Sequence, residues 1–251
     1  QHYPADTLKI DELLNKILGT TLKTVIARRA ENHVKLRVSD RNYDRLVTIQ
    51  SEDQKKITFY IGHGKAGSVH LRLKEEDRVY RIKELSTWKD FSTSASRYID
   101  TSYLKVSGAH RVLITGPGKR EINVKKVKGI WSVNGLNTEQ IDQDKAKRFV
   151  DAAKELIITE IDSDHAQAKH GFDTGIAVTV LGSKSKVSYR LGNDGDDQIF
   201  AQADGNKFVV KVPAYKVKAL MTQTLSDFMN EATKEELKAQ SIPTIQNSIE
   251  T

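Results

Sequence analysis

The spacing of apolar residues predicts two amphipathic helices. In each, apolar side chains recur at intervals of three and four residues, which places them on one helical face. Asp6 and Asp142 precede the two helices in the position of an N-cap residue. The first stripe is Ile10, Leu13, Leu14, Ile17 and Leu18, and the second is Ala146, Phe149, Val150, Ala153 and Ile157.

Each predicted helix is followed by segments with the alternating pattern of strands. Residues 57–62 match residues 187–192 at an offset of 130, and the same offset carries Val69 onto Ile199 and Val79 onto Val209. With one position of slippage, residues 47–49 fall on 178–180. The pattern predicts an α+β fold of two tandem repeats, each a helix packed on an antiparallel β-meander, joined by a β-containing connector.

The repeat suggests boundaries for three segments. We expect a first α+β unit at 1–86, a connector at 87–134, and a second unit with C-terminal helices at 135–251. Strand candidates within the connector are 111–115, 121–127 and 129–133, the last ending just before the second helix. No such strand precedes the first helix, so we expect the natural protein to extend upstream of Gln1.

Several of these segments together resemble a known family. They are Tyr3-Pro4-Ala5-Asp6 at the start of the first helix, the strand at 57–62 with its glycine turn, residues 69–72 followed by Val79-Tyr80, the stretch from Trp88 to Leu104, and Gly129-Ile130-Trp131. Over nearly the whole chain, this set resembles the bacterial domain-of-unknown-function family 4340. These motifs are structural patterns, and the resemblance implies no catalytic residues.

The resemblance implies a location and a class of partner. Proteins of that family look like an N-terminal membrane anchor followed by repeated α+β units outside the cytoplasm, and some are encoded beside ABC-type transport components. We therefore expect an extracytoplasmic protein, in the periplasm or cell envelope, anchored by a segment upstream of Gln1. Its expected partner is a membrane or envelope protein, and no specific nucleic acid is expected.

Composition removes several classes of chemistry. The 251 residues include no cysteine, which excludes disulfides, thiolate zinc sites, iron–sulfur clusters and cysteine nucleophiles. The formal charge of +7 is uneven along the chain. Residues 1–140 hold 26 Lys+Arg and 16 Asp+Glu, or +10, whereas residues 141–251 hold 14 and 17, or −3.

The densest basic segment follows the predicted turn at Gly116-Pro117-Gly118. It is a candidate anion-binding site, either for phosphates or for an anionic surface. The alternative is a solvated strand whose lysines prevent edge pairing, and this is favoured because no aromatic residue alternates with the cations. The candidate residues are Lys119, Arg120, Lys125, Lys126 and Lys128.

Three motifs invite a ligand-binding interpretation, and in each the structural alternative is favoured. Residues 62–67 fit the dinucleotide pattern G-x-G-x-x-G, but a strand pattern follows where a helix is required. The corresponding turn at 192–197 carries Asp194, Asp196 and Asp197 without the remaining features of a calcium loop. A cluster of Asp162, Asp164, His165 and His170 has no familiar zinc spacing and reads as a polar connection.

The sequence therefore predicts no catalytic residue, no cofactor and no metal site. The leading hypothesis is a non-enzymatic extracytoplasmic accessory or binding module of a membrane-associated complex, of the ABC-type transport or cell-envelope kind. One alternative is a binder of nucleic acid or another anionic polymer through residues 119–128. Another is an enzyme with an unrecognised site between the repeat units.

Overall fold

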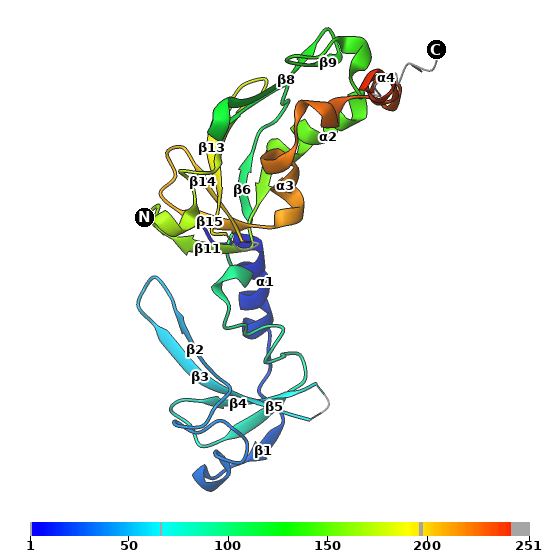
Figure 1. Cartoon of the computed structure of the whole chain (residues 1–251). Helices are drawn as coiled ribbons and strands as arrows, with labels where there is room; N and C mark the ends of the chain where they lie inside the picture. Colours follow the sequence, from blue (N-terminus) through cyan, green and yellow to red (C-terminus); the bar gives the residue numbers. More distant parts are fainter. Residues whose placement is uncertain (1, 66, 196–197, 242–251) are drawn as a thin grey trace, which may run out of the picture. The chain divides into compact units, whose positions relative to one another are not determined.

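The computed structural model describes residues 2–65, 67–195 and 198–241. Over these residues it has four α-helices and three antiparallel β-sheets, so the predicted α+β class is confirmed (Figure 1). The chain divides into two compact units, Gln1–Asp100 and Thr101–Thr251. Each unit is described by itself.

Unit 1 combines one helix with a five-stranded sheet. Helix α1 (Thr7–Leu18) begins where the Asp6 carboxylate accepts a hydrogen bond from the Lys9 amide, as its N-cap position predicts. The strand order is β1-β5-β4-β3-β2. The strands are β1 (Val25–Ala27), β2 (Arg45–Gln50), β3 (Lys56–His63), β4 (Val69–Leu73) and β5 (Val79–Ile82), with short 3₁₀ turns η1 (Ala30–Asn32) and η2 (Ala95–Arg97).

The sheet of unit 1 is covered on both faces. Leu13 and Ile17 of α1 pack against a core that includes Phe59 and Leu71. On the other face, the buried Arg72 lies over the Tyr60 ring at 4.5 Å and donates to the Val38 carbonyl at 2.7 Å. This arginine ties the irregular segment before β2 to the sheet.

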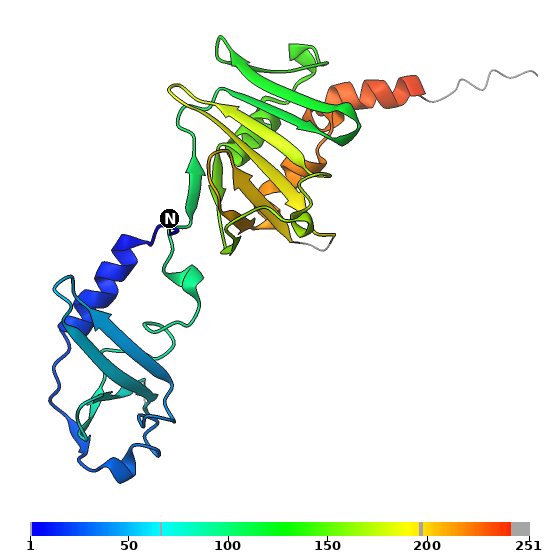
Figure 2. The same ribbon diagram turned by 90° about the vertical axis from the view of Figure 1, so that its left-hand side faces the viewer.

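Unit 2 is built on an eight-stranded sheet of order β11-β15-β14-β13-β12-β7-β8-β9, and β10 pairs with β6 in a separate ribbon. Figure 2 shows helices α2 and α3 on the same face of the large sheet. The strands are β6 (Ser102–Lys105), β7 (Arg111–Gly116), β8 (Arg120–Val127), β9 (Ile130–Val133), β10 (Glu155–Ile157), β11 (Glu160–Ser163), β12 (Ile176–Leu181), β13 (Lys186–Asn193), β14 (Ile199–Ala203) and β15 (Val209–Val212). The helices are α2 (Gln143–Ala153), α3 (Ala214–Thr222) and α4 (Glu231–Ser241), with 3₁₀ turns η3 (Pro117–Lys119), η4 (Thr138–Gln140), η5 (Ala168–His170) and η6 (Leu225–Phe228).

Helix α2 packs into the core of unit 2 with one buried face. It is capped by Asp142, whose carboxylate accepts from the amides of Asp144 and Lys145, both at 3.0 Å. Its Phe149 ring meets Phe228 edge-on at 5.0 Å between centroids, and the Tyr189 hydroxyl donates to the Ala153 carbonyl at 2.9 Å. Full burial raises the pKa of Tyr189 far above its usual range, so the phenol stays a neutral donor.

The strands predicted at 111–115, 121–127 and 129–133 correspond to β7, β8 and β9. Strand β7 pairs with β12, with Val112 opposite Val180 and Ile114 opposite Val178. Within the predicted connector, β7, β8 and β9 therefore belong to the large sheet of unit 2, and β6 belongs to its two-stranded ribbon. None of the described helices has the length and apolar character that crossing a bilayer requires.

The two units contain strand pairs with the same numerical register. In unit 1, Phe59 lies opposite Leu73, and in unit 2, Tyr189 lies opposite Ala203, in each case 130 residues later. The next pair behaves alike, since Val69 faces Ile82 and Ile199 faces Val212.

Candidate functional site

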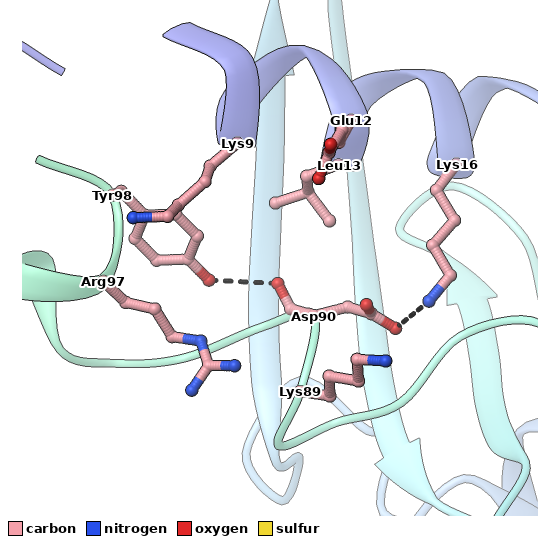
Figure 3. Close-up of a pocket in the computed structure, with 8 residues that line it drawn as sticks. All are labelled: Lys9, Glu12, Leu13, Lys16, Lys89, Asp90, Arg97 and Tyr98. Atoms are coloured by element: carbon pink, nitrogen blue, oxygen red, sulfur yellow. Dashed lines mark hydrogen bonds and ion pairs between the residues drawn. The ribbon is translucent and has the colours of Figure 1, made fainter. Parts of the chain in front are cut away.

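A strongly charged concavity in unit 1 lies between helix α1 and residues 86–98. It encloses about 300 Å³ (Figure 3). One wall comes from successive turns of α1 and the other from the segment that follows β5. The lining residues are Lys9, Glu12, Leu13, Lys16, Lys89, Asp90, Arg97 and Tyr98.

The helical wall of this pocket follows from the spacing of its residues. Lys9, Leu13 and Lys16 are four and three residues apart, so they lie on one face of α1. The same face carries the apolar stripe, whose Leu13 contacts the core. The lysines therefore stand at the edge of the stripe and flank the opening.

Asp90 anchors the opposite wall. Its carboxylate accepts a hydrogen bond from the Ser86 amide at 2.7 Å and pairs with Lys16 Nζ at 2.6 Å, and its side chain is 10% exposed. Its carbonyl oxygen accepts from the Tyr98 hydroxyl at 3.0 Å. These contacts, drawn partly in Figure 3, fix the position of residues 86–98 against α1.

Positive charge is in excess around the pocket. Lys9 is paired with Asp6 at 2.8 Å, and hydrogen bonds from Lys9 hold the pKa of Asp6 below its usual range. Lys16 is neutralised by Asp90. Among the described residues, the charged groups of Lys89 and Arg97 have no ion-pair partner. The lining holds two carboxylates, Glu12 and the Asp90 carboxylate that is paired with Lys16, against four cations. The arrangement suits an anion that accepts hydrogen bonds from both cations.

The structure places the residues of the predicted basic segment in separate environments. Arg120 donates from its guanidinium to the carbonyls of Leu220 and Gln223 at 2.9 and 2.7 Å, and also to that of Met221. It caps the C-terminal end of α3, and burial lowers its pKa. Its donors are thus directed at main-chain oxygens, not at solvent.

The lysines of the segment divide between the faces of β8. Lys125 lies directly opposite Arg111 of β7, whereas the Lys126 ammonium lies 5.3 Å from the centre of the Trp131 ring. Lys128 occupies the β8–β9 turn with φ of 49°. The side chain of Lys119 lies outside the described residues. Anion binding by this segment remains a prediction.

The aromatic neighbour of Lys126 was missed because Trp131 lies on the next strand. A two-residue Lys128-Gly129 turn between strands sets a hairpin register that brings positions 126 and 131 together. This turn can be recognised in the sequence, and it predicts that positions 126 and 131 lie opposite each other. It shows that an aromatic residue can stand beside the cations without alternating with them along one strand.

The described residues of the glycine motif at 62–67 lie in strand β3 and in the turn that leads to β4, an arrangement that differs from a nucleotide loop. Gly62 lies within β3, and the next element is β4, not a helix. A Cβ on Gly62 would lie 2.2 Å from the Leu36 carbonyl oxygen, so the backbone approach explains the glycine. Ala66 lies outside the described residues, as do Asp196 and Asp197 of the predicted acidic turn.

The histidine and aspartate cluster at 162–170 forms a structural network. The fully buried His170 bonds Asp162 at 2.9 Å through Nε2, while its Nδ1 accepts from the Gln167 amide at 2.8 Å. Burial opposes the charge of Asp162, but hydrogen bonds from Lys169 and His170 outweigh it and hold its pKa below the usual range. In the described part of the chain, no group of three metal-ligating side chains is placed to hold an ion.

The fold is of the mixed α+β class. The chain belongs to the DUF4340 family, described as a domain of unknown function, and the family profile matches residues 1–173. Comparison with curated proteins and with solved structures finds no similar chain.

Proposed function

We propose that the protein is a non-enzymatic binding module that recognises an anionic group in the pocket of unit 1. The observation that carries this proposal is the pair of cations, Lys89 and Arg97, which face the pocket without ion-pair partners in the described structure. A carboxylate or phosphate group offers acceptors for both.

We also propose that this module acts outside the cytoplasm as an accessory of a transport or envelope complex. The support for this location is the resemblance of the family to anchored proteins encoded beside ABC-type transport components. The expected partner is a membrane or envelope protein. Recovery of the native protein from the cytoplasmic fraction after cell fractionation would refute the location.

We further propose that the two units are tandem copies of one scaffold. The strand registers that recur at an offset of 130 support this, as do the aspartate caps of α1 and α2. Glycines at the same offset, Gly62 and Gly192, are both approached by a backbone carbonyl from a preceding turn. On this proposal the pocket of unit 1 is a feature by which one copy has diverged.

The anion site is tested by calorimetric titration of the full chain with inorganic phosphate and with citrate. For the double variant Lys89→Ala/Arg97→Ala we expect at least about a tenfold loss of affinity, because two charge-assisted hydrogen bonds are removed. The matched control is Lys35→Ala/Lys56→Ala, which removes two exposed cations of unit 1 away from the pocket. Equal losses in both variants, or no saturable binding by the wild type, would refute the site.

A second candidate is binding of an anionic polymer on the sheet of unit 2. It is favoured by the like-charged pair Arg111 and Lys125, which are directly opposite on neighbouring strands, a placement that costs stability without a counter-charge. A fluorescent oligothymidylate or polyglutamate should bind with affinity that falls steeply with salt. Undetectable binding of both at low ionic strength would exclude it.

A further inference from the structure

Strand β2 forms an edge of the unit 1 sheet. It pairs with β3 on one side, and no strand among the described residues pairs with its other side. Its six residues pair in unbroken register with β3, from Arg45 opposite Ile61 to Gln50 opposite Lys56. The strand is therefore regular and long enough to accept another strand.

The hydrogen-bond pattern shows which groups face this edge. Beyond β2, the Ser51 amide donates to the Lys55 carbonyl at 2.9 Å, so residues of odd number direct their backbone groups toward β3. The Thr58 carbonyl accepts from Lys74 on the far side of β3, which agrees with this alternation. The N–H and C=O groups of Leu46, Thr48 and Gln50 consequently point outward.

Other sheet edges are blocked in ways that β2 is not. Edge strands β1 and β11 each contain a register shift that distorts the ladder. At the edge of β9, the Gln143 side-chain amide accepts from the Trp131 N–H at 2.7 Å and donates to its C=O at 3.0 Å. Strand β2 contains no lysine, proline or bulge. Its one charged residue, Arg45, donates from its guanidinium to the carbonyls of Phe91 and Asp44, both at 2.6 Å.

Strand β12 of unit 2 shows how such an edge is completed. It pairs with β13 as β2 pairs with β3, but its other side is covered by β7. Val178 and Val180 of β12 are fully buried, whereas Val47 and Ile49 of β2 are only half-buried. The difference follows from the apolar side chains that β7 places beside β12.

The helices of the two units differ in the same sense. Helix α2 packs against β7 and β9 and has four buried residues, including Phe149 and Val150. Helix α1 buries none completely, and its Leu8 and Leu18 are 75% and 71% exposed. In unit 1 the edge of β2 and part of the apolar side of α1 are thus exposed, whereas in unit 2 added strands cover the edge of β12 and pack against α2.

We propose that the edge of β2 binds an extended strand of a partner protein, antiparallel to β2, with an aliphatic side chain at every second position. The partner's aliphatic side chains pack beside Val47 and Ile49, as Val112 and Ile114 of β7 pack beside Val180 and Val178. Its backbone bonds the outward groups of Leu46, Thr48 and Gln50. This is β-strand addition. It rests on the proposed correspondence of the two units and is independent of the anion pocket.

The probe is a fluorescent peptide with the sequence of residues 109–116, Ala-His-Arg-Val-Leu-Ile-Thr-Gly, titrated with the full chain while anisotropy is measured. We expect saturable binding by the wild type. Thr48→Pro removes an outward N–H while leaving the bonds to β3, and should weaken binding at least about tenfold. Val47→Lys, which places a charge on the apolar side of the edge, should weaken binding to a similar extent.

The controls separate edge pairing from other effects. Thr48→Val changes the exposed outer face, keeps the outward N–H and adds no charge, so it should stay within about twofold of the wild type. A peptide N-methylated at Leu113 and Thr115 should not bind, because those amides would pair with β2. Thermal melts identify any variant that fails to fold. Thr48→Pro and Val47→Lys disrupt different features of the edge, so the binding measured for whichever of them folds is sufficient to test the proposal.

Two results would overturn the proposal. Absence of saturable peptide binding by a folded wild type would show that the edge does not accept a strand of this chemistry. A dimer in sedimentation velocity that is abolished by Thr48→Pro would assign the edge to a second copy of the chain. Neither result would alter the expected response of the pocket to phosphate or citrate, so failure of the edge and failure of the anion site are distinguishable.

Discussion

Arg120 is predicted to stabilise unit 2 by capping helix α3. Its guanidinium donates to the carbonyls of Leu220, Met221 and Gln223, three acceptors at the C-terminal end of that helix. The last carbonyls of a helix have no partner within it, so removal of the guanidinium leaves them to water or to nothing. The positive charge also interacts favourably with the negative end of the helix dipole.

The expected magnitude follows from these contacts. Hydrogen bonds from a charged donor contribute about 1.5–3 kcal/mol each when both partners are in place, but water replaces part of the loss at a partly exposed site. We therefore expect Arg120→Ala to lower the free energy of unfolding of unit 2 by about 2–4 kcal/mol. For a unit of this size, that corresponds to a fall in Tm of about 5–15 °C.

The assay is urea and thermal unfolding followed by tryptophan fluorescence. Trp131 is 7% exposed within unit 2, and Trp88 of unit 1 is 65% exposed, so a Trp88→Phe background reports unit 2 alone. Lys125→Ala is the control, because it removes an exposed cation of the same strand. Arg120→Lys should recover part of the stability, since an ammonium keeps the charge but cannot reach three carbonyls with a planar fork.

Two outcomes would contradict the predicted role of Arg120 as a helix cap. If the free energy of unfolding of Arg120→Ala lies within about 0.5 kcal/mol of that of the Lys125→Ala control, the cap contributes no more to stability than an ordinary surface residue. If the same variant also weakens polyanion binding more than Lys125→Ala does, Arg120 belongs to the anion-binding segment that its sequence neighbours suggest.

Three further predictions concern buried polar groups and close backbone contacts. Asp162→Asn should destabilise unit 2 by about 1–3 kcal/mol at neutral pH. Because the folded pKa of Asp162 is lowered, the stabilising contribution of its carboxylate is fully present above the unfolded pKa of about 3.9 and is lost as pH falls through the folded pKa. The urea midpoints of variant and wild type should therefore begin to converge below about pH 4 and meet only below the folded pKa. Gly192→Ala should lower the free energy of unfolding by at least about 2 kcal/mol, since its Cβ would lie 2.1 Å from the His170 carbonyl oxygen. Gly118→Ala is the control: its Cβ would meet nothing within 4 Å, so only the strain of its positive φ, about 1 kcal/mol, should be lost. Arg72→Met should destabilise unit 1 by about 3 kcal/mol, measured by denaturant unfolding, because it leaves the buried carbonyl of Val38 without its donor.

Local pattern was sufficient to predict much of the fold. The helices begin at their predicted caps, Asp6 and Asp142, and the predicted strands of the meanders form where the alternation places them. These features depend on residues within a few positions of one another. The pairing of β7 with β12 does not, because it joins strands more than sixty residues apart, and apolar alternation alone does not specify which edge a strand will join.

Because local pattern does not specify tertiary contacts, it also does not show that the charges of the basic segment are separated in space while those of the pocket come together. Cations that are neighbours in a strand alternate between its faces. The four cations of the run whose side chains are described are therefore divided among a helix cap (Arg120), two sheet faces (Lys125 and Lys126) and a turn (Lys128). The cations of the pocket come from α1 and from residues 89–97, which neither local density nor periodicity connects. A count of charge along the chain therefore measures how basic a segment is but not whether its charges meet. Binding of an anion requires charges that lie close together in space, and in the pocket of unit 1 the cations are brought together by tertiary contacts between α1 and residues 89–97.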